Sequence, residues 1–399
     1  MLLYFKTSNN LSFDKEIDFS MVAGSYTELP QNIIPLEKQK VSIVKSAAIL
    51  GANASGKSNF IKCANFAKFL ITDDNYLFFH NKNKQINKNK PTTYCFGILI
   101  EGNQFEYSFS LNKDRIIEEK LIEYITQKPT QHFYRKYNFE TKNYEWSQFS
   151  KSLKENKVVL NEIKKVLPEK SLFLNRVAQF EIQLFKDIFY FFKKFLILDK
   201  YVLDKVENHM KQIIFKKIKK EPEFKYNIIK ELKRADFMIE KIDVFEDEKQ
   251  NLELISFHNS IKEDGDIVEE IYDFELNESI GTQKFLLLFS LLIMTINTKG
   301  ILMVDEFDNS LHTHLSQHLL SMVHDLTTNT NNVQLIFTIH DTNLINQKLL
   351  RRDQIWFAER DSIGNSKIIP LSDYKVKKGK DLENSYLQGV YGAIPNIEK

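Results

Sequence analysis

The chain has 399 residues, a formal net charge of +2 and 43% hydrophobic residues. This length allows two or three compact units, and the balanced charge gives no argument for nucleic-acid binding by bulk electrostatics. Two cysteines, Cys63 and Cys95, provide no spaced metal-binding set. The N-terminus lacks a signal-peptide pattern, and the apolar run 285–296 is too short to span a bilayer. We therefore expect a cytoplasmic protein that does not use a membrane.

The first element is a hairpin, predicted from residues 1–7 and 11–22 around a Ser-Asn-Asn turn. An apolar strand at 47–50 leads into Gly51-Ala-Asn-Ala-Ser-Gly56-Lys57-Ser58, which matches G-x-x-x-x-G-K-[ST] and precedes a helix-compatible stretch. This context is typical of a phosphate-binding loop. Lys57 would reach the β- and γ-phosphates, and the Ser58 hydroxyl would ligate Mg²⁺. The predicted nucleotide-binding residues of this segment are Gly51, Asn53, Ala54, Ser55, Gly56, Lys57, Ser58 and Asn59.

The middle of the chain changes character. Residues 81–90 predict a polar loop, and 92–146 predict several short strands of an antiparallel β layer. Residues 148–240 have helical spacing without sustained heptads, so we expect a helical insertion and no long coiled coil. Its phenylalanine stripe is either core or an interaction surface. The basic stretches 216–220 and 375–380 are solvated faces or, alternatively, nucleic-acid contacts.

Strands at 241–246, 252–258 and 267–276 are expected to return the chain to the main body. The segment Glu278-Ser279-Ile-Gly281-Thr-Gln283 then precedes a strongly apolar helix. Ser279 suits an N-cap, and Gly281 permits close approach of an anion to the backbone. A helix N-terminus of this kind is a potential phosphate site, although the segment on its own equally fits a simple helix cap.

A second buried strand at 301–304 ends in Asp305-Glu306. In P-loop proteins a carboxylate at the end of a strand near the phosphate-binding loop holds Mg²⁺, and we assign this role to Asp305. Glu306 would act as the general base that activates water. The strand 334–339 ends at His340, which could sense the γ-phosphate. Asp341 is expected to cap the next helix.

Together these segments resemble an ABC-type ATPase head of the kind found in SMC proteins. The resemblance matches residues 51–58 to Walker A, 305–306 to Walker B, 279–283 to the signature, 308–312 with Asn309 to the D-loop, and His340 to the switch histidine. The signature departs from Leu-Ser-Gly-Gly-Gln. This variant, with 351–357 and 386–395, resembles AAA-family ATP-binding proteins of bacterial anti-phage and abortive-infection systems (RloA/AbiLi-type, related to the OLD family). Gln104 and Gln179 are weak candidates for the Q-loop glutamine.

The resemblance implies an α/β P-loop NTPase with a mixed sheet, flanking helices and an antiparallel β layer. The expected units are 1–147 (first half of the head), 148–240 (helical insertion) and 241–399 (second half). It also implies ATP hydrolysis with Mg²⁺, and a homodimer or higher even oligomer in which Ser279, Gly281 and Gln283 contact ATP bound by the other copy. A regulatory role controlling a separate effector nuclease encoded nearby is the first functional hypothesis; a DNA-clamping SMC-like repair ATPase is the alternative. A transporter subunit fits poorly.

Overall fold

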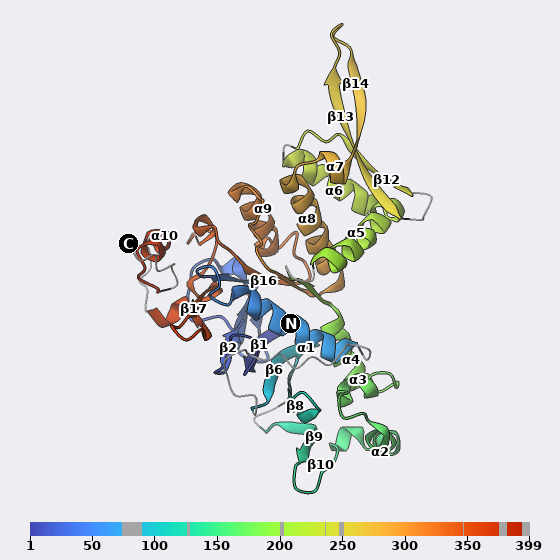
Figure 1. Cartoon of the computed structure of the whole chain (residues 1–399), viewed down its shortest axis with the longest axis vertical. Helices are drawn as coiled ribbons and strands as arrows, with labels where there is room; N and C mark the ends of the chain where they lie inside the picture. Colours follow the sequence, from blue (N-terminus) through green and yellow to red (C-terminus); the bar gives the residue numbers. More distant parts are fainter. Residues whose placement is uncertain are drawn as a thin grey trace.

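The computed structural model describes residues 1–73, 90–125, 128–199, 203–235, 237–246, 251–345, 347–374 and 381–392. Within these ranges the strands form two large sheets and two small ones. Figure 1 shows a head built around the large sheets, with a narrow β arm projecting from one end. All but the last residue of the predicted loop 81–90, the basic stretch 375–380 and the last residues of 386–395 lie outside the described ranges.

The antiparallel β layer predicted for the first part of the chain is confirmed. It is a seven-stranded sheet in the order β10-β9-β8-β7-β6-β1-β2, with β1 and β2 forming the predicted hairpin. Its strands alternate buried and partly exposed residues, as a sheet with one covered face requires. The strands are β1 (Leu2–Ser8), β2 (Ile17–Ser20), β6 (Thr92–Ile100), β7 (Asn103–Leu111), β8 (Ile116–Tyr124), β9 (Thr130–Asn138) and β10 (Asn143–Trp146).

The second large sheet is mixed, as predicted, and carries the nucleotide-site motifs. Its order is β11-β15-β16-β5-β17-β18, with all neighbours parallel except the pair β17–β18. The central strands are buried along their whole length because helices or the other sheet cover both faces. The strands are β5 (Ser46–Leu50), β11 (Phe195–Leu198), β15 (Ile301–Val304), β16 (Gln334–Thr338), β17 (Ile355–Arg360) and β18 (Ser366–Pro370).

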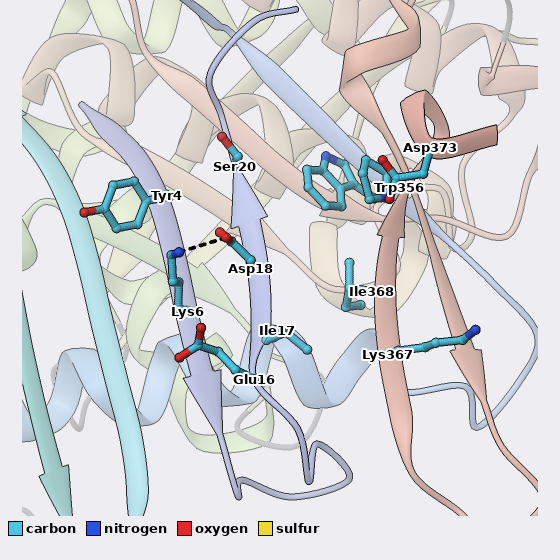
Figure 2. A pocket seen from close by; sticks show the side chains of 11 residues that line it. Tyr4, Lys6, Glu16, Ile17, Asp18, Ser20, Trp356, Lys367, Ile368 and Asp373 are labelled. Atoms are coloured by element: carbon cyan, nitrogen blue, oxygen red, sulfur yellow. Dashed lines mark hydrogen bonds and ion pairs between the residues drawn. The ribbon is translucent and has the colours of Figure 1, made fainter. Parts of the chain in front are cut away.

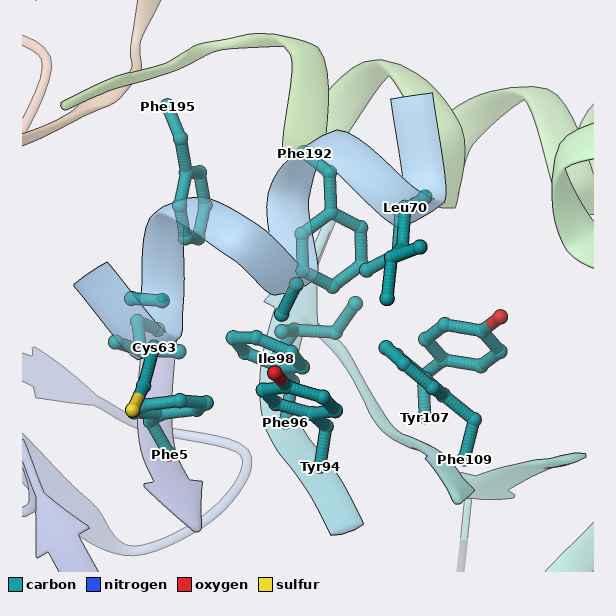
Figure 3. Close-up of a cluster of buried hydrophobic side chains, with 14 of the residues drawn as sticks. Phe5, Cys63, Leu70, Tyr94, Phe96, Ile98, Tyr107, Phe109, Phe192 and Phe195 are labelled. Atoms are coloured by element: carbon teal, nitrogen blue, oxygen red, sulfur yellow. The ribbon is translucent and has the colours of Figure 1, made fainter. Parts of the chain in front are cut away.

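Helix α1 (Lys57–Thr72) lies between the two sheets and joins them through one core. Figure 3 shows aromatic side chains from β1, β6 and β7 meeting α1, with Phe192 and Phe195 closing the cluster from the other side. Phe96, for example, stacks on Phe5 and meets Phe192 edge-on. Cys63 is fully buried here as a free thiol, which confirms its predicted place in the core.

Residues 148–240 are mainly helical, as expected, with one departure. The stretch contains β11, which pairs in parallel with β15 and therefore belongs to the central sheet rather than to an insertion. Its four apolar residues form a strand too short to be told from a helix by periodicity alone. The phenylalanine stripe is core, since Phe185, Phe189 and Phe192 are buried. The helices are α2 (Lys157–Val166), α3 (Phe173–Val177), α4 (Gln183–Lys193), α5 (Leu203–Lys220) and α6 (Pro222–Arg234).

The strands predicted after this region exist, but they do not return to the head. β12 (Lys241–Glu246), β13 (Leu252–Ile261) and β14 (Ile267–Asp273) form their own antiparallel sheet, whose β13–β14 hairpin is the projecting arm of Figure 1. The sequence shows strand periodicity but not which sheet a strand joins. The short helix α7 (Phe274–Asn277) then leads into α8 (Ile280–Thr298).

Helix α8 is long and apolar enough, by length and composition, to cross a membrane, unlike the shorter run considered in the sequence. However, 61% of its most apolar window is buried inside the protein, as in the core helix of a globular domain. It packs against α6, α9 and β15. The remaining elements are β3 (Ile33–Leu36), β4 (Val41–Val44), α9 (Thr313–His324) and α10 (Leu382–Leu387), with short 3₁₀ turns at 30–32, 151–153, 342–344, 352–354 and 371–374.

Candidate active site

The glycine loop follows β5 and ends where α1 begins, so the strand–loop–helix context expected of a phosphate site is present. Gly56, with φ +115°, precedes the first helical residue, and Ala54 also has a positive φ of 62°. A Cβ on Gly51 would lie 2.3 Å from the carbonyl oxygen of Ala358, and one on Gly56 would lie 2.4 Å from the Ser366 hydroxyl. Both glycines are therefore fixed by close packing against the β17–β18 hairpin.

Lys57 is buried at the start of α1, and its ammonium lies within the loop. Nζ donates hydrogen bonds to the carbonyl oxygens of Gly51 at 2.5 Å and Ala52 at 3.1 Å. Burial lowers the pKa of Lys57 to about 8, against the opposing effect of Asp305, Asp308 and Glu306. The three carboxylates that influence Lys57 all lie in the segment that follows strand β15.

Asp305 follows β15 and is buried. Its Oδ1 accepts a hydrogen bond from the Thr338 hydroxyl at 2.7 Å, whereas Oδ2 is buried without a hydrogen-bond partner in the protein. A buried carboxylate oxygen that lacks a partner is costly unless a ligand completes it. This oxygen is available to coordinate a divalent cation, and Mg²⁺ prefers oxygen ligands.

Glu306 has a left-handed backbone with φ +52°. Such a conformation is uncommon for a residue other than glycine, and strained residues of this kind cluster at functional sites. Hydrogen bonds hold it: its N–H donates to the Thr338 hydroxyl at 2.8 Å, its carbonyl oxygen accepts from the N–H of Asn309 at 3.2 Å, and Oε2 accepts from Asn309 Nδ2 at 3.1 Å. Asn309, predicted in the D-loop, therefore orients the predicted base of its own chain.

Asp308 connects the segment after β15, predicted as the D-loop, to the segment after β16 that contains His340. Its Oδ2 accepts the backbone N–H groups of His340 at 2.8 Å and Asp341 at 2.5 Å. Desolvation lowers the pKa of His340, and the positive charge of Lys57 lowers it further. The structure thus brings His340 into the electrostatic neighbourhood of Lys57, as its proposed role requires. Asp341 caps the following turn by accepting from the N–H of Asn343, which confirms that expectation.

The segment predicted as the signature lies at the start of α8, and the expected helix cap is present. Ser279 is the N-cap and accepts a hydrogen bond from the N–H of Thr282 at 3.1 Å. A Cβ on Gly281 would lie 2.9 Å from the carbonyl oxygen of Ser310, so this glycine is required by packing within its own chain. Gln283 Nε2 donates to the carbonyl oxygens of Glu275 and Glu278. In this structure Gln283 holds the loop before α8, and its contact with nucleotide stays a prediction.

Several residues at the site were not identified from the sequence. Thr338 hydrogen-bonds both Asp305 and the N–H of Glu306, yet a threonine at a strand end carries no pattern that would reveal this. Asp199 follows β11 and is buried. Burial lowers the pKa of the nearby Lys62, and the charges of Asp199 and Asp305 act in the opposite direction, raising it. Asp199 was missed because β11 was not recognised as a strand of this sheet. By contrast, Gln104 lies in β7, within the antiparallel layer.

The surroundings of the loop also include residues from distant segments. Asn59 Nδ2 donates to the Ser12 hydroxyl at 2.8 Å, and the N–H of Ser366 donates to the carbonyl oxygen of Ser12 at 2.7 Å. Arg360 Nη1 reaches the carbonyl oxygen of Ala54 at 3.4 Å. The turn after β1 and the β17–β18 hairpin therefore border the loop on the side where α1 begins.

Comparison with known families decides the assignment. Residues 46–346 match the family described as "AAA domain, putative AbiEii toxin, Type IV TA system". The chain belongs to this family. The match covers every motif from β5 to the switch segment, and it confirms an AAA-type P-loop ATPase domain with a link to abortive infection.

Other comparisons add less to the family assignment. Among solved structures, the SMC head domain from Thermotoga maritima is similar at 14% identity, covering 92% of this chain and 98% of that chain, with a TM-score of 0.40. A search of curated proteins found no match.

A separate cavity of about 600 Å³ lies where the edge strands β2 and β18 diverge, shown in Figure 2. Trp356 and Ile368 border it from the central sheet, and Lys6 and Asp18 from the hairpin, joined by a 2.8 Å ion pair. None of the residues predicted to bind or hydrolyse nucleotide lines this cavity. The cavity is therefore distinct from the phosphate loop.

Thr338→Val should destabilise the protein by roughly 1–3 kcal/mol, because the hydroxyl that serves both Asp305 and Glu306 is lost from a buried site. Chemical denaturation measures this change. Thr338→Ser is the matched control, since it keeps the hydroxyl and should remain close to wild type. Equal stability of the valine and serine variants would show that the bridge contributes nothing.

Proposed function

We propose that this protein hydrolyses ATP with Mg²⁺ between two head domains and that it regulates an anti-phage response carried out by a separate effector nuclease. The observation that supports hydrolysis best is that Lys57, which follows β5 and the glycine loop, is influenced electrostatically by Asp305 and Glu306, which follow β15 in the same parallel sheet. One buried oxygen of Asp305 has no hydrogen-bond partner in the protein. The family match supports the defence context.

The residues present fit ATP and Mg²⁺. The loop from Gly51 to Gly56 supplies backbone N–H groups and the N-terminus of α1, which favour phosphate. Ser58 and Asp305 would hold the Mg²⁺ ion, which neutralises charge on the phosphates. Glu306, oriented by Asn309, would accept a proton from water. His340 stands beside this group, tied to Asp308, where it would respond to the γ-phosphate.

The second head is proposed from the surface around the signature. Ile280, between Ser279 and Gly281, is 72% exposed, and Leu276 is 83% exposed. Large apolar side chains of this kind are typical of a surface that a partner covers. The N-terminus of α8 carries free N–H groups that its own phosphate loop does not require. A second copy would bring its bound ATP to this place, so that ATP joins the two heads.

Mixing two inactive variants tests the shared site. Gly281 is unsuitable for substitution, because a side chain there would collide with Ser310 of the same chain. Ile280→Glu instead places a negative charge opposite the partner's phosphates without disturbing the core. We expect Ile280→Glu and Lys57→Ala each to lack ATPase activity, and their mixture to recover part of it in steady-state phosphate release.

Val158→Glu is the control for a charge placed on an exposed apolar residue outside the proposed head contact, since Val158 lies on α2 and is 75% exposed, and it should retain activity. Full activity of Ile280→Glu alone would reject the signature's action on the partner. If the two variants associate but the mixture remains inactive at every ratio, then a single site built from the phosphate loop of one chain and the signature of the other does not hydrolyse ATP by itself.

The separate effector has its own test. Because the family description includes a toxin, the alternative is that this chain is itself toxic. We expect bacteria expressing the wild-type chain alone, or Glu306→Gln, to grow normally. Growth arrest by the wild-type chain alone, relieved by Lys57→Ala, would contradict a separate effector and assign the toxic activity to this protein.

The DNA-clamping alternative predicts long coiled-coil arms. Among the described residues the longest helices are α8, with 19 residues, and α5, with 18. Both contribute buried residues to the hydrophobic core that covers one face of the central sheet. This arrangement favours a regulatory head over a clamp.

A further inference from the structure

The segment just before α8 is exposed except for one side chain. The other residues from 275 to 280 are exposed, whereas the side chain of Glu278 is only 10% exposed. The residue before a helix cap is often apolar, because it then packs against the first turn of the helix. A carboxylate that turns inward at this position needs partners, since burial of an unpaired charge is costly.

The partners of Glu278 lie on the projecting arm. Its Oε1 accepts hydrogen bonds from the Ser256 hydroxyl at 2.5 Å and from His258 Nε2 at 2.6 Å. Both donors lie on β13, and Ser256 is fully buried. The His258 ring in turn meets the ring of Tyr272 of β14 edge-on, with 5.2 Å between the centroids. Two neighbouring strands of the arm therefore fix the position of this one carboxylate.

Further contacts connect the arm to the start of α8. Asp273 caps α7 by accepting from the N–H of Leu276 at 2.8 Å, and Gln283 Nε2 donates to the carbonyl oxygen of Glu278 at 3.0 Å. Helix α7 contacts both β13 and β14, and Figure 1 shows the hairpin rising from α7 beside α8. The position of the α8 N-terminus is therefore determined by contacts with the arm.

This N-terminus is the part of α8 that would meet a phosphate. The Ser279 hydroxyl accepts from the N–H of Thr282, and the Ser279 carbonyl oxygen accepts from the N–H of Gln283. The N–H groups of Ile280 and Gly281 have no acceptor among the described residues, as is normal for the first turn of a helix. Such donors must lie within about 3 Å of the oxygen that they stabilise, so small displacements of this turn matter.

We infer that Glu278 is a positioning residue for ATP hydrolysis, which holds the first turn of α8 where the γ-phosphate bound by a second copy would reach it. The inference rests on the shared ATP site proposed above, and it adds a residue that does not itself contact nucleotide. Because both hydrogen-bond donors belong to β13, the arm and the signature move as one unit. Displacement of the arm would withdraw the first turn of α8 from the partner's ATP.

The same segment also contacts the catalytic side of its own chain, which provides a competing route. Gly281 lies against the carbonyl oxygen of Ser310, and Ser310 has a left-handed backbone with φ +64°. The neighbouring Asn309 bonds Glu306. An experiment must therefore separate action on the partner's site from action on the site of the same chain.

Glu278→Leu removes the acceptor and keeps a side chain of similar size. We expect it to lower steady-state phosphate release roughly ten- to hundred-fold, the range that corresponds to lost hydrogen bonds to a charged group. Affinity for ADP should not change, because ADP binds the chain's own loop and lacks the γ-phosphate that would meet the signature. Glu278→Gln should recover most of the activity, since its amide oxygen can accept both hydrogen bonds. Wild-type turnover in Glu278→Leu, or an equal loss in the leucine and glutamine variants, overturns the inference.

Glu231→Leu is the matched control for loss of stability. Glu231 of α6 pairs with His318 of α9 at 2.7 Å, and these side chains are 10% and 22% exposed, against 10% and 21% for Glu278 and His258. The control should lower the free energy of unfolding to a comparable extent in chemical denaturation and leave turnover unchanged. If it loses as much turnover as Glu278→Leu, then turnover only follows stability, and the positioning role is overturned.

A double-mutant cycle tests whether the arm acts through Glu278. Ser256→Ala combined with His258→Phe removes both donors, and the phenylalanine keeps an aromatic ring beside Tyr272. This variant should lose as much turnover as Glu278→Leu, and adding Glu278→Leu to it should cause no further loss. Losses that multiply would show that the arm and Glu278 act independently, which overturns their coupling.

Mixing with Lys57→Ala decides which site Glu278 serves. In a pair of one Glu278→Leu chain and one Lys57→Ala chain, the intact phosphate loop faces an intact signature, so part of the ATPase activity should return. If this mixture stays inactive while the mixture of Ile280→Glu with Lys57→Ala recovers activity, Glu278 acts on its own chain. The inference then fails and the shared site stands. If both mixtures stay inactive although the chains associate, the shared site as proposed fails, and the inference fails with it.

Discussion

Replacing Lys57 with alanine is expected to abolish nucleotide binding. The ammonium is buried in the loop and bonded to the carbonyl oxygens of Gly51 and Ala52, where it would meet the β- and γ-phosphates. Removing one partner of a buried charge pair costs roughly 2–5 kcal/mol, which is on the order of 10²–10³-fold in affinity. Calorimetric titration with a non-hydrolysable ATP analogue measures the loss.

Lys68→Ala is the matched control for this variant. Lys68 lies on the same helix, and burial likewise lowers its pKa to about 8. It should cost stability comparable to Lys57→Ala but leave affinity unchanged, since it is three turns from the loop. Unchanged affinity of Lys57→Ala, or an equal loss in both variants, would show that the phosphate-loop assignment is wrong.

The lowered pKa of Lys57 also predicts a pH dependence. Phosphate favours the charged ammonium, so bound nucleotide raises the pKa above its value of about 8 in the free protein. Below pH 8 the lysine is already protonated and affinity should be constant. Above pH 8 binding must also take up a proton, so affinity should fall by up to about ten-fold per pH unit. The Lys68→Ala variant should show the same fall in nucleotide affinity above pH 8, because Lys57 is unchanged in it.

Local sequence was sufficient for the motifs whose geometry is local. The glycine loop, the Ser279 cap and the Asp341 cap each depend on a few neighbouring residues, and the structure has the predicted strand, loop or helix at each place. The residue types alone predict the local backbone at these places, because glycine permits positive φ and serine or aspartate accepts hydrogen bonds from free N–H groups at a helix start.

Contacts between distant segments could not be predicted in the same way. Strand β11 has only four residues, and its place beside β15 depends on pairing with a segment about a hundred residues later. For the same reason Asp199 and Thr338 were not recognised as neighbours of Asp305. The strands β12 to β14 show the converse: their periodicity was clear, but periodicity does not determine which sheet a strand joins.

The structure also changes the physical meaning of two predicted residues. Gly281 was selected for the approach of a phosphate, yet its closest constraint is the carbonyl oxygen of Ser310 in the same chain. Asn309 was selected by resemblance to the D-loop, and it bonds Glu306 of its own chain. Both observations determine which substitutions can test a role toward a second copy.

Glu306→Gln is expected to bind ATP normally and to stop its hydrolysis. The amide keeps the size of the carboxylate and can still accept the hydrogen bond from Asn309, so the left-handed backbone at this position need not change. It cannot accept a proton from water, because an amide oxygen is a very weak base. Loss of a general base lowers rates by roughly 10²–10⁴-fold. Single-turnover phosphate release measures the step directly.

The comparison with binding makes this prediction specific. Affinity for the ATP analogue should match wild type, because Lys57, Ser58 and Asp305 are unchanged. Glu246→Gln is the control, since it removes an exposed acid that pairs with Lys219 far from the loop, and it should turn over ATP at the wild-type rate. If Glu306→Gln hydrolyses ATP within a few-fold of wild type, the base lies elsewhere, and His340, held by Asp308 beside the same carboxylates, is the next residue to replace.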